Sequence, residues 1–274
     1  MIKVGFQGNH GTFSEIATLT YFKNREVELA GYKNFISIMN DLDQDIIQYA
    51  VLPVENTTTG IISRTYDLFQ HHNVHIEGEL NVPIHQNLIV VPGTKLEEIE
   101  EVYSHPEALS QCANFFEQNP RIRQRPYQDT AKSVEYVKEM NDHTKAALGS
   151  WRAAEYYGME SLIDSINDSK LNMTRFLIVT NQEVEVENAN KISMMLVLKH
   201  TPGALYNVLG ILAKRGINIL KLESRPIQGK IFEYQFYVDI TGNLKKKDVK
   251  EAIHEIQLRS ESCMVFGNYV AANS

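Results

Sequence analysis

Three polar clusters in the sequence carry side chains that could bind or transform a small acid. Residues 53–60, PVENTTTG, place a carboxylate, an amide and three hydroxyls directly after an apolar run, where α/β proteins bind their ligands. Asn172, Thr174 and Arg175 stand just before a second apolar run, and the guanidinium of Arg175 suits bidentate pairing with a carboxylate. Residues 5–11, GFQGNHG, could present backbone N–H groups to an anion at the start of a helix.

Each of these clusters also has a structural interpretation. Thr12 and Glu15 have the spacing of a helix capping box, and Asn56 or a neighbouring threonine could cap the helix that follows it. The glycine spacing GxxGxxG lacks the Rossmann and P-loop patterns, which disfavours nucleotide binding. For Arg175, an ion pair at the surface end of a strand is the alternative to catalysis. No single motif decides between these interpretations.

Three histidines, His71, His72 and His75, are the nearest approach to a metal motif in the sequence. They follow a predicted helix, and the negative end of a helix dipole favours imidazoles without any metal. We therefore predict no metal site.

Composition limits the class of protein. The chain has 274 residues, 27 Lys and Arg against 34 Asp and Glu, and 43% hydrophobic residues, as in an ordinary globular protein of two domains. The net charge of -7 disfavours nucleic acid as a partner. No segment approaches the roughly 18 apolar residues of a membrane span, so no membrane association is predicted. Two distant cysteines and an amino terminus without signal-peptide features predict a cytoplasmic location.

Over the first two thirds of the chain, short apolar runs alternate with stretches of helical period, which is typical of an α/β domain. The runs predict strands at 4–6, 49–54, 86–91, 101–103, 146–148 and 175–180. The periodic stretches predict helices at 13–22, 61–70, 108–118, 130–139 and 152–157.

The last third of the chain has a different pattern. Residues 183–190 are polar and acidic without large apolar side chains, which predicts a linker. Alternating apolar residues then predict strands at 192–198, 217–225, 232–240 and 264–270, and helical spacing predicts helices at 205–212 and 244–256. The order βαββαβ is that of a ferredoxin-like unit.

Several motifs follow one another in a fixed order: GTFS, PVENTTTG, VYSHPEALSQC, DTAKSV, AALGS, NMTRF, GAL and ESRP. This ordered set resembles the prephenate dehydratase family over essentially the whole chain. The resemblance implies a two-lobed, periplasmic-binding-protein-like α/β catalytic domain over residues 1–182. Its first lobe would comprise about 1–78 plus 174–182, and its second about 79–173. The resemblance further implies a ferredoxin-like ACT regulatory domain over residues 191–274.

By resemblance, the activity is the cofactor-free conversion of prephenate to phenylpyruvate, water and CO2 in phenylalanine biosynthesis. Thr174 would assist the departing hydroxyl, with Arg175 and Asn172 as its catalytic neighbours. Adjacent residues of a regular strand point to opposite faces, so Thr174 and Arg175 share a cleft only if the chain bends. The resemblance implies further substrate-binding residues: Thr12, Ser14, Glu55, Asn56, Thr57, Ser104, Gln111, Thr130, Ser133 and Phe176. For Glu55 we favour a structural role, because an ionised carboxylate would repel a dianionic substrate.

The ACT resemblance implies feedback inhibition by L-phenylalanine. The backbone of Gly203, Ala204 and Leu205 would face the carboxylate of the amino acid. Asn218 and the segment Glu223, Ser224, Arg225 and Pro226 would come from a second subunit. We therefore expect at least a dimer, either a homodimer or a homotetramer.

Two alternatives remain open in the sequence. Arogenate dehydratases perform the same chemistry on a substrate that carries an amine, and a two-lobed domain could also be a non-catalytic cytosolic binding protein for amino acids or aromatic acids. The chain departs from the usual family pattern at Glu107, where glutamine is common, and at Trp151.

Overall fold

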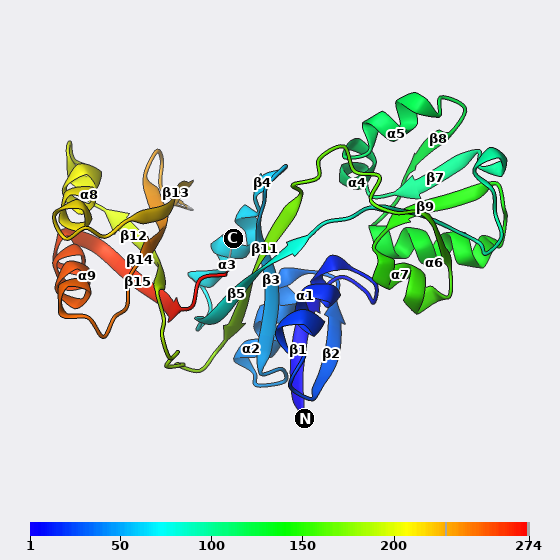
Figure 1. Cartoon of the computed structure of the whole chain (residues 1–274). Coiled ribbons are helices and arrows are strands. Elements are labelled where there is room, and N and C mark those ends of the chain that lie inside the picture. Colours follow the sequence, from blue (N-terminus) through cyan, green and yellow to red (C-terminus); the bar gives the residue numbers. More distant parts are fainter. Residues whose placement is uncertain (228, 273–274) are drawn as a thin grey trace. The chain divides into compact units, whose positions relative to one another are not determined.

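The computed structural model describes residues 1–227 and 229–272, and it divides the chain into two compact units (Figure 1). The first unit comprises Met1–Leu68 and Leu80–Phe176, and the second comprises Phe69–Glu79 together with the chain from Leu177 onward. None of the helices in the described part of the chain has both the length and the apolar character needed to cross a membrane.

The first sheet contains the amino-terminal strand and has the order β2-β1-β3-β11-β5, with β4 paired to β3. Strand β3 is buried over five consecutive residues, as expected for a central strand covered on both faces. Its strands are β1 (Ile2–Gln7), β2 (Val27–Tyr32), β3 (Tyr49–Asn56), β4 (Gly60–Ile61), β5 (His75–Pro83) and β11 (Met173–Thr180). Its helices are α1 (Phe13–Tyr21), α2 (Phe35–Asp43) and α3 (Ser63–Phe69).

The second sheet forms the other lobe of the first unit and has the order β10-β6-β9-β7-β8. Its strands are β6 (Asn87–Val90), β7 (Glu101–Ser104), β8 (Arg123–Pro126), β9 (Lys145–Gly149) and β10 (Glu160–Ile163). Its helices are η1 (Leu96–Glu98), α4 (Pro106–Ser110), α5 (Ala113–Gln118), α6 (Thr130–Met140) and α7 (Trp151–Tyr157). Apolar clusters pack on both faces of this sheet, around Leu88 and Val102 on one side and around Ile89 and Val134 on the other.

The two lobes of the first unit approach each other closely at Gly11. A Cβ atom at this position would lie 2.7 Å from the Cα of Ala153, and the backbone has a φ of +89°. Only glycine satisfies both requirements. The Ser150 hydroxyl donates to the Gly11 carbonyl (2.5 Å), so the first glycine-rich turn is fixed against the start of α7. Trp151, the first residue of this helix, is exposed.

The single helix predicted over 108–118 is wrong, because the chain breaks at Gln111 and Cys112 into α4 and α5. The Asp168 carboxylate accepts from the N–H groups of Ala113 and Asn114 (3.0 Å each), which starts a new helix there. Cys112 is fully buried at the break. Gln111 therefore ends a short helix, and its side chain extends to the polar network described below.

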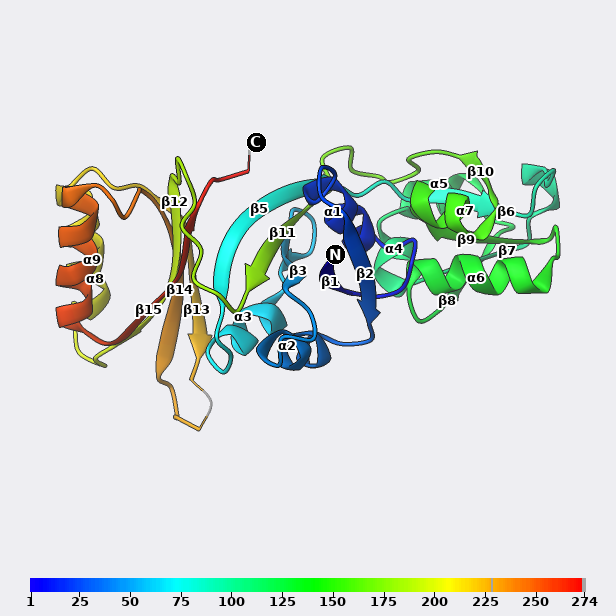
Figure 2. The ribbon, with the colours of Figure 1, turned by 90° about the horizontal axis from the view of Figure 1, so that it is seen from below.

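The second unit contains a four-stranded antiparallel sheet with the order β13-β14-β12-β15. Its strands are β12 (Lys191–Leu198), β13 (Ile219–Pro226), β14 (Tyr234–Thr241) and β15 (Ser260–Tyr269). Helices α8 (Ala204–Lys214) and α9 (Lys247–Arg259) lie side by side on one face (Figures 1 and 2). The predicted α/β class and the βαββαβ order are confirmed.

The first strand of this βαββαβ sheet is joined to the middle of β5 by a buried ionic cluster. The Lys191 ammonium lies 3.0 and 2.9 Å from the two carboxylate oxygens of Glu79, and 3.6 Å from Asp239. The Ser193 hydroxyl donates to Asp239 (2.6 Å) and also contacts the Tyr269 hydroxyl. All of these side chains are buried, so the cluster fixes the register between the segment 69–79 and the sheet.

Candidate active site

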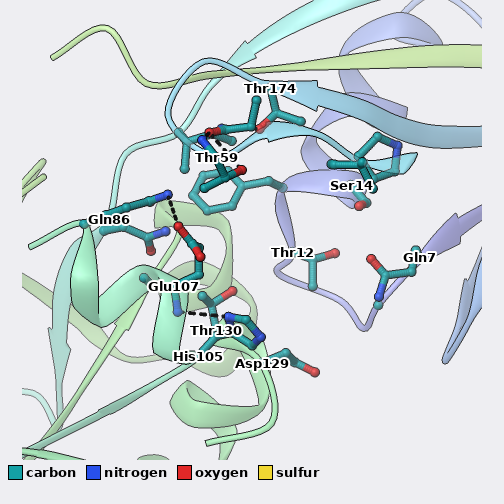
Figure 3. A pocket seen from close by; sticks show the side chains of 18 of the residues that line it. Gln7, Thr12, Ser14, Thr59, Gln86, His105, Glu107, Asp129, Thr130 and Thr174 are labelled. Atoms are coloured by element: carbon teal, nitrogen blue, oxygen red, sulfur yellow. Dashed lines mark hydrogen bonds between the residues drawn. The ribbon is translucent and has the colours of Figure 1, made fainter. Parts of the chain in front are cut away.

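A cavity of about 370 Å³ opens between the two lobes of the first unit (Figure 3). Both lobes contribute to it, with Thr12 and Thr174 from the first and His105 and Thr130 from the second. Most of the residues in its wall are polar, two of them, Glu107 and Asp129, are carboxylates, and none of the described residues that line it is lysine or arginine. Five predicted substrate-binding residues other than Thr12 also line it: Ser14, Asn56, Gln111, Thr130 and Phe176.

Two helices begin at the cavity wall, one from each lobe. Thr12 caps α1, and its hydroxyl accepts from the Glu15 N–H (3.4 Å). Asp129 caps α6, and its carboxylate accepts from the Lys132 N–H (2.7 Å). The first N–H groups of a helix have no partner within it, and the helix dipole is positive at this end. The start of each helix therefore favours negative charge at the cavity wall, and at α6 the Asp129 carboxylate already supplies one such charge.

Behind Thr174, three amide and hydroxyl side chains form a closed ring of hydrogen bonds with Asn56. The Asn56 Nδ2 donates to the Asn172 Oδ1 (2.8 Å), and the Asn172 Nδ2 donates to the Gln111 Oε1 (3.0 Å). The Gln111 Nε2 donates to the Thr58 hydroxyl (3.2 Å), which donates to the Asn56 Oδ1 (2.5 Å). Asn172 is buried behind the wall, and the ring connects both lobes.

The ring fixes the direction in which the Thr174 hydroxyl can donate. The Asn56 Oδ1 accepts from the N–H groups of Thr58 (2.9 Å) and Thr59 (3.0 Å), which can only donate. The other end of this amide must then be its NH2 group, which donates to the Thr174 Oγ1 (2.9 Å). This hydroxyl accepts from Asn56, and none of the hydrogen bonds found for the described residues uses its own proton, so the proton is available to a ligand in the cavity.

Arg175 and Glu55 do not line this cavity. The Arg175 guanidinium lies 3.1 Å from the Glu55 carboxylate and donates to the Tyr66 hydroxyl (3.0 Å). The strand does not bend at Thr174, so the two neighbours point to opposite faces, as strand geometry requires. In this structure Arg175 is paired with Glu55 and Tyr66 and is not among the described residues that line the cavity.

Three other predicted substrate-binding residues also use their hydroxyls within the protein. Ser104 donates to the Leu148 carbonyl (3.0 Å) and Ser133 donates to the Asp129 carbonyl (2.6 Å), and both are fully buried. Thr57 donates to the Leu171 carbonyl (2.7 Å) and accepts from the Met173 N–H (3.0 Å). None of the three is among the described residues that line the cavity.

The cavity contains functional side chains that the sequence did not indicate. Gln7, Gln86, His105, Glu107 and Asp129 all line it (Figure 3). The His105 Nδ1 accepts from the Glu107 N–H (3.2 Å), so a neutral ring carries its proton on Nε2. Glu107, where the chain departs from the family motif, is not among the predicted site residues. Its carboxylate oxygen nevertheless lies 3.5 Å from the Nε2 of Gln111, which is one of them.

Cys112 follows Gln111 but offers no nucleophile to the cavity. Burial, and after it the charge of Asp168, raises the pKa of its thiol to about 12. Almost no thiolate then forms at neutral pH. Among the described residues we also find no group of three or more His, Cys, Asp or Glu side chains placed to bind a metal ion.

The predicted regulatory residues lie on two elements of the second unit. Gly203 begins α8 with a φ of +82°, followed by Ala204 and Leu205, which line a cavity of about 150 Å³. Glu223, Ser224, Arg225 and Pro226 end β13, the edge strand of the sheet. Asn218 precedes that strand, where its N–H donates to the Thr241 hydroxyl (3.0 Å).

Comparison with known proteins identifies relatives for both parts of the chain. The prephenate dehydratase family model matches residues 4–184, and the ACT domain model matches residues 194–257. Arogenate dehydratase/prephenate dehydratase 1 of Arabidopsis thaliana is 33% identical over 284 residues, which cover 98% of this chain and 72% of that protein.

Two solved structures are similar over nearly the whole chain, each with 26% identity and a TM-score of 0.90. One is a prephenate dehydratase from Arthrobacter aurescens in complex with L-Phe, with 98% of this chain and 90% of that chain covered. The other is GqqA, described as a novel type of quorum quenching acylase, with 98% of each chain covered.

Proposed function

The chain belongs to the prephenate dehydratase family, and we propose that its interlobe cavity converts prephenate to phenylpyruvate, water and CO2. The observation that carries this proposal is the Thr174 hydroxyl, which lines the cavity and accepts from Asn56, so that its own proton can be donated to a ligand. Such a donor is what a departing hydroxyl group needs. The reaction requires no cofactor, because the substrate itself supplies the electrons.

The chemistry divides into two bond cleavages. The bond between the ring and its carboxylate breaks, and its electron pair enters the ring as CO2 departs. The C4–O bond breaks in concert, so the ring becomes aromatic and the oxygen leaves with one added proton as water. A threonine hydroxyl is too weakly acidic to be the source of that proton, and its contribution is a hydrogen bond that strengthens as charge develops on the oxygen. Three titratable side chains line the cavity wall, and because the Asp129 carboxylate caps α6, His105 and Glu107 are the two proposed as proton sources.

The two helix N-termini fit the charge of the substrate. Prephenate carries two carboxylates, and the N–H groups at the start of α1 and of α6 lie on opposite walls of the cavity. Thr12 and Ser14 add hydroxyls on one side, and Thr130 adds one on the other. In this proposal Asn172 and Gln111 are positioning residues, since they act on Thr174 through Asn56.

The test is a cofactor-free assay of the purified chain with prephenate, following phenylpyruvate. Thr174→Val removes the hydroxyl with little change in volume and should lower kcat by about 10²–10³, the effect of one transition-state donor. Thr20→Val is the matched control, because the Thr20 hydroxyl bonds only the carbonyl of its own helix at Ile16. Turnover by the Thr174 variant equal to that of the control would contradict the assignment.

Arogenate is the second candidate substrate, because it undergoes the same reaction and carries an ammonium in place of the ketone. A carboxylate, Glu107, lines the cavity, and no described lining residue is a lysine or arginine. This wall tolerates a cationic group at the substrate side chain. Parallel assays with prephenate and arogenate measure the preference as a ratio of kcat/KM values.

Acyl-amide hydrolysis, as in the structural neighbour GqqA, is less well supported by the contacts in the cavity. An acylase needs a nucleophile or water activated by a base, and none of the hydrogen bonds found for the described residues joins His105 to a lining serine or threonine. An N-acylated amine included in the same assay should give no product. Amide cleavage without phenylpyruvate formation would replace the dehydratase proposal.

We infer that the domain over 191–274 binds L-phenylalanine and inhibits the enzyme as an oligomer. The turn at Gly203 offers N–H groups to a carboxylate, and β13 is an edge strand whose outer hydrogen-bonding groups suit pairing with a second subunit. The segment 223–226 would then complete the site across the interface. Sedimentation with and without phenylalanine, beside inhibition curves, tests the oligomer and the regulation together.

The proposal also includes the domain limits and the location of the enzyme. We assign catalysis to residues 1–182, the linker to 183–190 and regulation to 191–274, in a cytoplasmic enzyme. Limited proteolysis that cuts first within 183–190 would support these limits.

A further inference from the structure

Gln86 is a buried amide of the cavity wall whose oxygen has no partner. Its side chain is 3% exposed, and its Oε1 makes no hydrogen bond in the described structure. The backbone around it is fixed, because the Gln86 N–H donates to the Asn167 Oδ1 (2.7 Å) and its carbonyl accepts from the Ile166 N–H (2.9 Å). A buried polar atom without a partner is unfavourable unless a ligand supplies one.

The two chain segments that cross between the lobes place Gln86 away from Thr174. The Ile84 N–H donates to the Asn172 carbonyl (2.8 Å), which pairs the two crossings at this point. From there one crossing continues into the second lobe to Gln86, and the other continues into the first lobe to Thr174 (Figure 1). Four extended steps separate the two Cα atoms by on the order of 13 Å. Figure 3 accordingly shows their side chains on different sides of the cavity.

This separation assigns the two side chains to opposite ends of the substrate. Thr174 contacts the C4 hydroxyl, and the opposite end of the ring, at C1, carries a carboxylate and the three-carbon side chain. The carboxylates already have the helix N-termini as partners, and those termini start at Thr12 and Asp129. The group left for Gln86 is the C2 substituent of the side chain, a ketone in prephenate and an ammonium in arogenate.

We propose that Gln86 is a specificity-determining residue whose amide contacts the C2 substituent of the substrate side chain. This inference rests on the proposed dehydratase function and deepens it. An amide can donate to a ketone through Nε2 or, turned by 180°, accept from an ammonium through Oε1. A neutral glutamine therefore accommodates both substrates, whereas a carboxylate at the same place would attract the ammonium and repel the ketone oxygen.

Two variants test the proposal with prephenate and arogenate side by side. Gln86→Glu should raise the arogenate-to-prephenate ratio of kcat/KM at least about tenfold, since one charge then distinguishes the two groups. Gln86→Met should lower kcat/KM for both substrates about tenfold. The melting temperature of the methionine variant should not fall, because the lost oxygen has no partner within the protein.

Gln128→Glu is the matched control, because it adds the same charge at an exposed position of the same cavity. A similar change of ratio in this control would assign the effect to net charge and overturn the proposal. Wild-type kinetics of Gln86→Met on both substrates would also overturn it, and that variant covers the case in which Gln86→Glu does not fold. Failure of the wild-type chain on both substrates would instead contradict the proposed function itself.

Discussion

Asn56→Asp should inactivate the enzyme by replacing the NH2 group that donates to Thr174 and to Asn172, whose own amide must then turn to donate in return. Aspartate has the shape of asparagine, and one of its oxygens can still accept from the N–H groups of Thr58 and Thr59. Its other oxygen cannot donate to Thr174, as the Asn56 Nδ2 does over 2.9 Å. The Thr174 hydroxyl would then donate to Asp at position 56, and the departing oxygen of the substrate would lose its donor.

The size of this effect follows from the loss of one donor in the transition state. Such a loss lowers kcat by about 10²–10³, or about 2.7–4 kcal/mol. Thr174→Val should cost the same amount, because both changes remove the same hydrogen bond. The double variant should therefore be no worse than either single variant, with a coupling free energy of about 2.7–4 kcal/mol.

The assay is a double-mutant cycle of kcat with prephenate at saturating concentration. Gln128→Glu controls for the added negative charge, which should act mainly on KM because the substrate is a dianion. Additive losses in the double variant would refute the reasoning, since Asn56 would then act on the substrate independently of Thr174. Full kcat in Asn56→Asp would refute it as well.

Three further predictions concern stability and regulation. Lys191→Met leaves the buried carboxylates of Glu79 and Asp239 without their ammonium and should cost about 3–5 kcal/mol in urea denaturation, most of it regained in Lys191→Met/Glu79→Leu; a loss below about 1 kcal/mol would contradict the burial of the cluster. Hydrogen bonds from Lys145, Tyr103 and Arg125 lower the pKa of Glu101 from 4.5 to about 2, so its contribution to stability is complete above about pH 4.5 and disappears as the pH falls through about 2. Acid titration of Glu101→Gln should lack that part of the pH dependence. Gly203→Ala should raise the phenylalanine concentration for half inhibition at least about tenfold, because an L side chain is strained at a φ of +82°; unchanged inhibition would place the effector elsewhere.

Helices and strands could be told apart wherever the periodic pattern of apolar residues extended over many residues. The βαββαβ order follows from alternation in residues such as Ile192, Met194 and Leu196, which form one face of a buried core with Val208 and Leu212. Strand β2 and helix α2 (Val27–Tyr32 and Phe35–Asp43) were not predicted, because their burial is partial and their apolar pattern is short. The break at Gln111 was also not predictable, since it depends on Asp168, which is distant in sequence.

The residues of the candidate site were predictable only in part, because motifs identify residues but not the contacts between them. Motifs identified Thr174, Asn56, Asn172 and Gln111, but only the fold shows that the three amides share one hydrogen-bonded ring and that Asn56 donates to Thr174. Gln86 belongs to no recognisable motif, and its unpaired oxygen is a property of packing alone. The only feature of the sequence that drew attention to Gln86 was its position at the start of a predicted strand.

The location of Arg175 outside the cavity agrees with what decarboxylation requires. A guanidinium beside the ring carboxylate would stabilise the ionised substrate more than the neutral CO2 that departs, and would therefore raise the barrier to decarboxylation. Arg175 is instead paired with Glu55 and Tyr66 outside the cavity, where strand alternation places it once Thr174 points inward. Anions bind to the cavity through helix N-termini, whose partial charges hold a carboxylate less tightly than a full cation does. A wall whose described residues include one oriented hydroxyl and no lysine or arginine thus favours the transition state over the bound substrate, which is the requirement for catalysis.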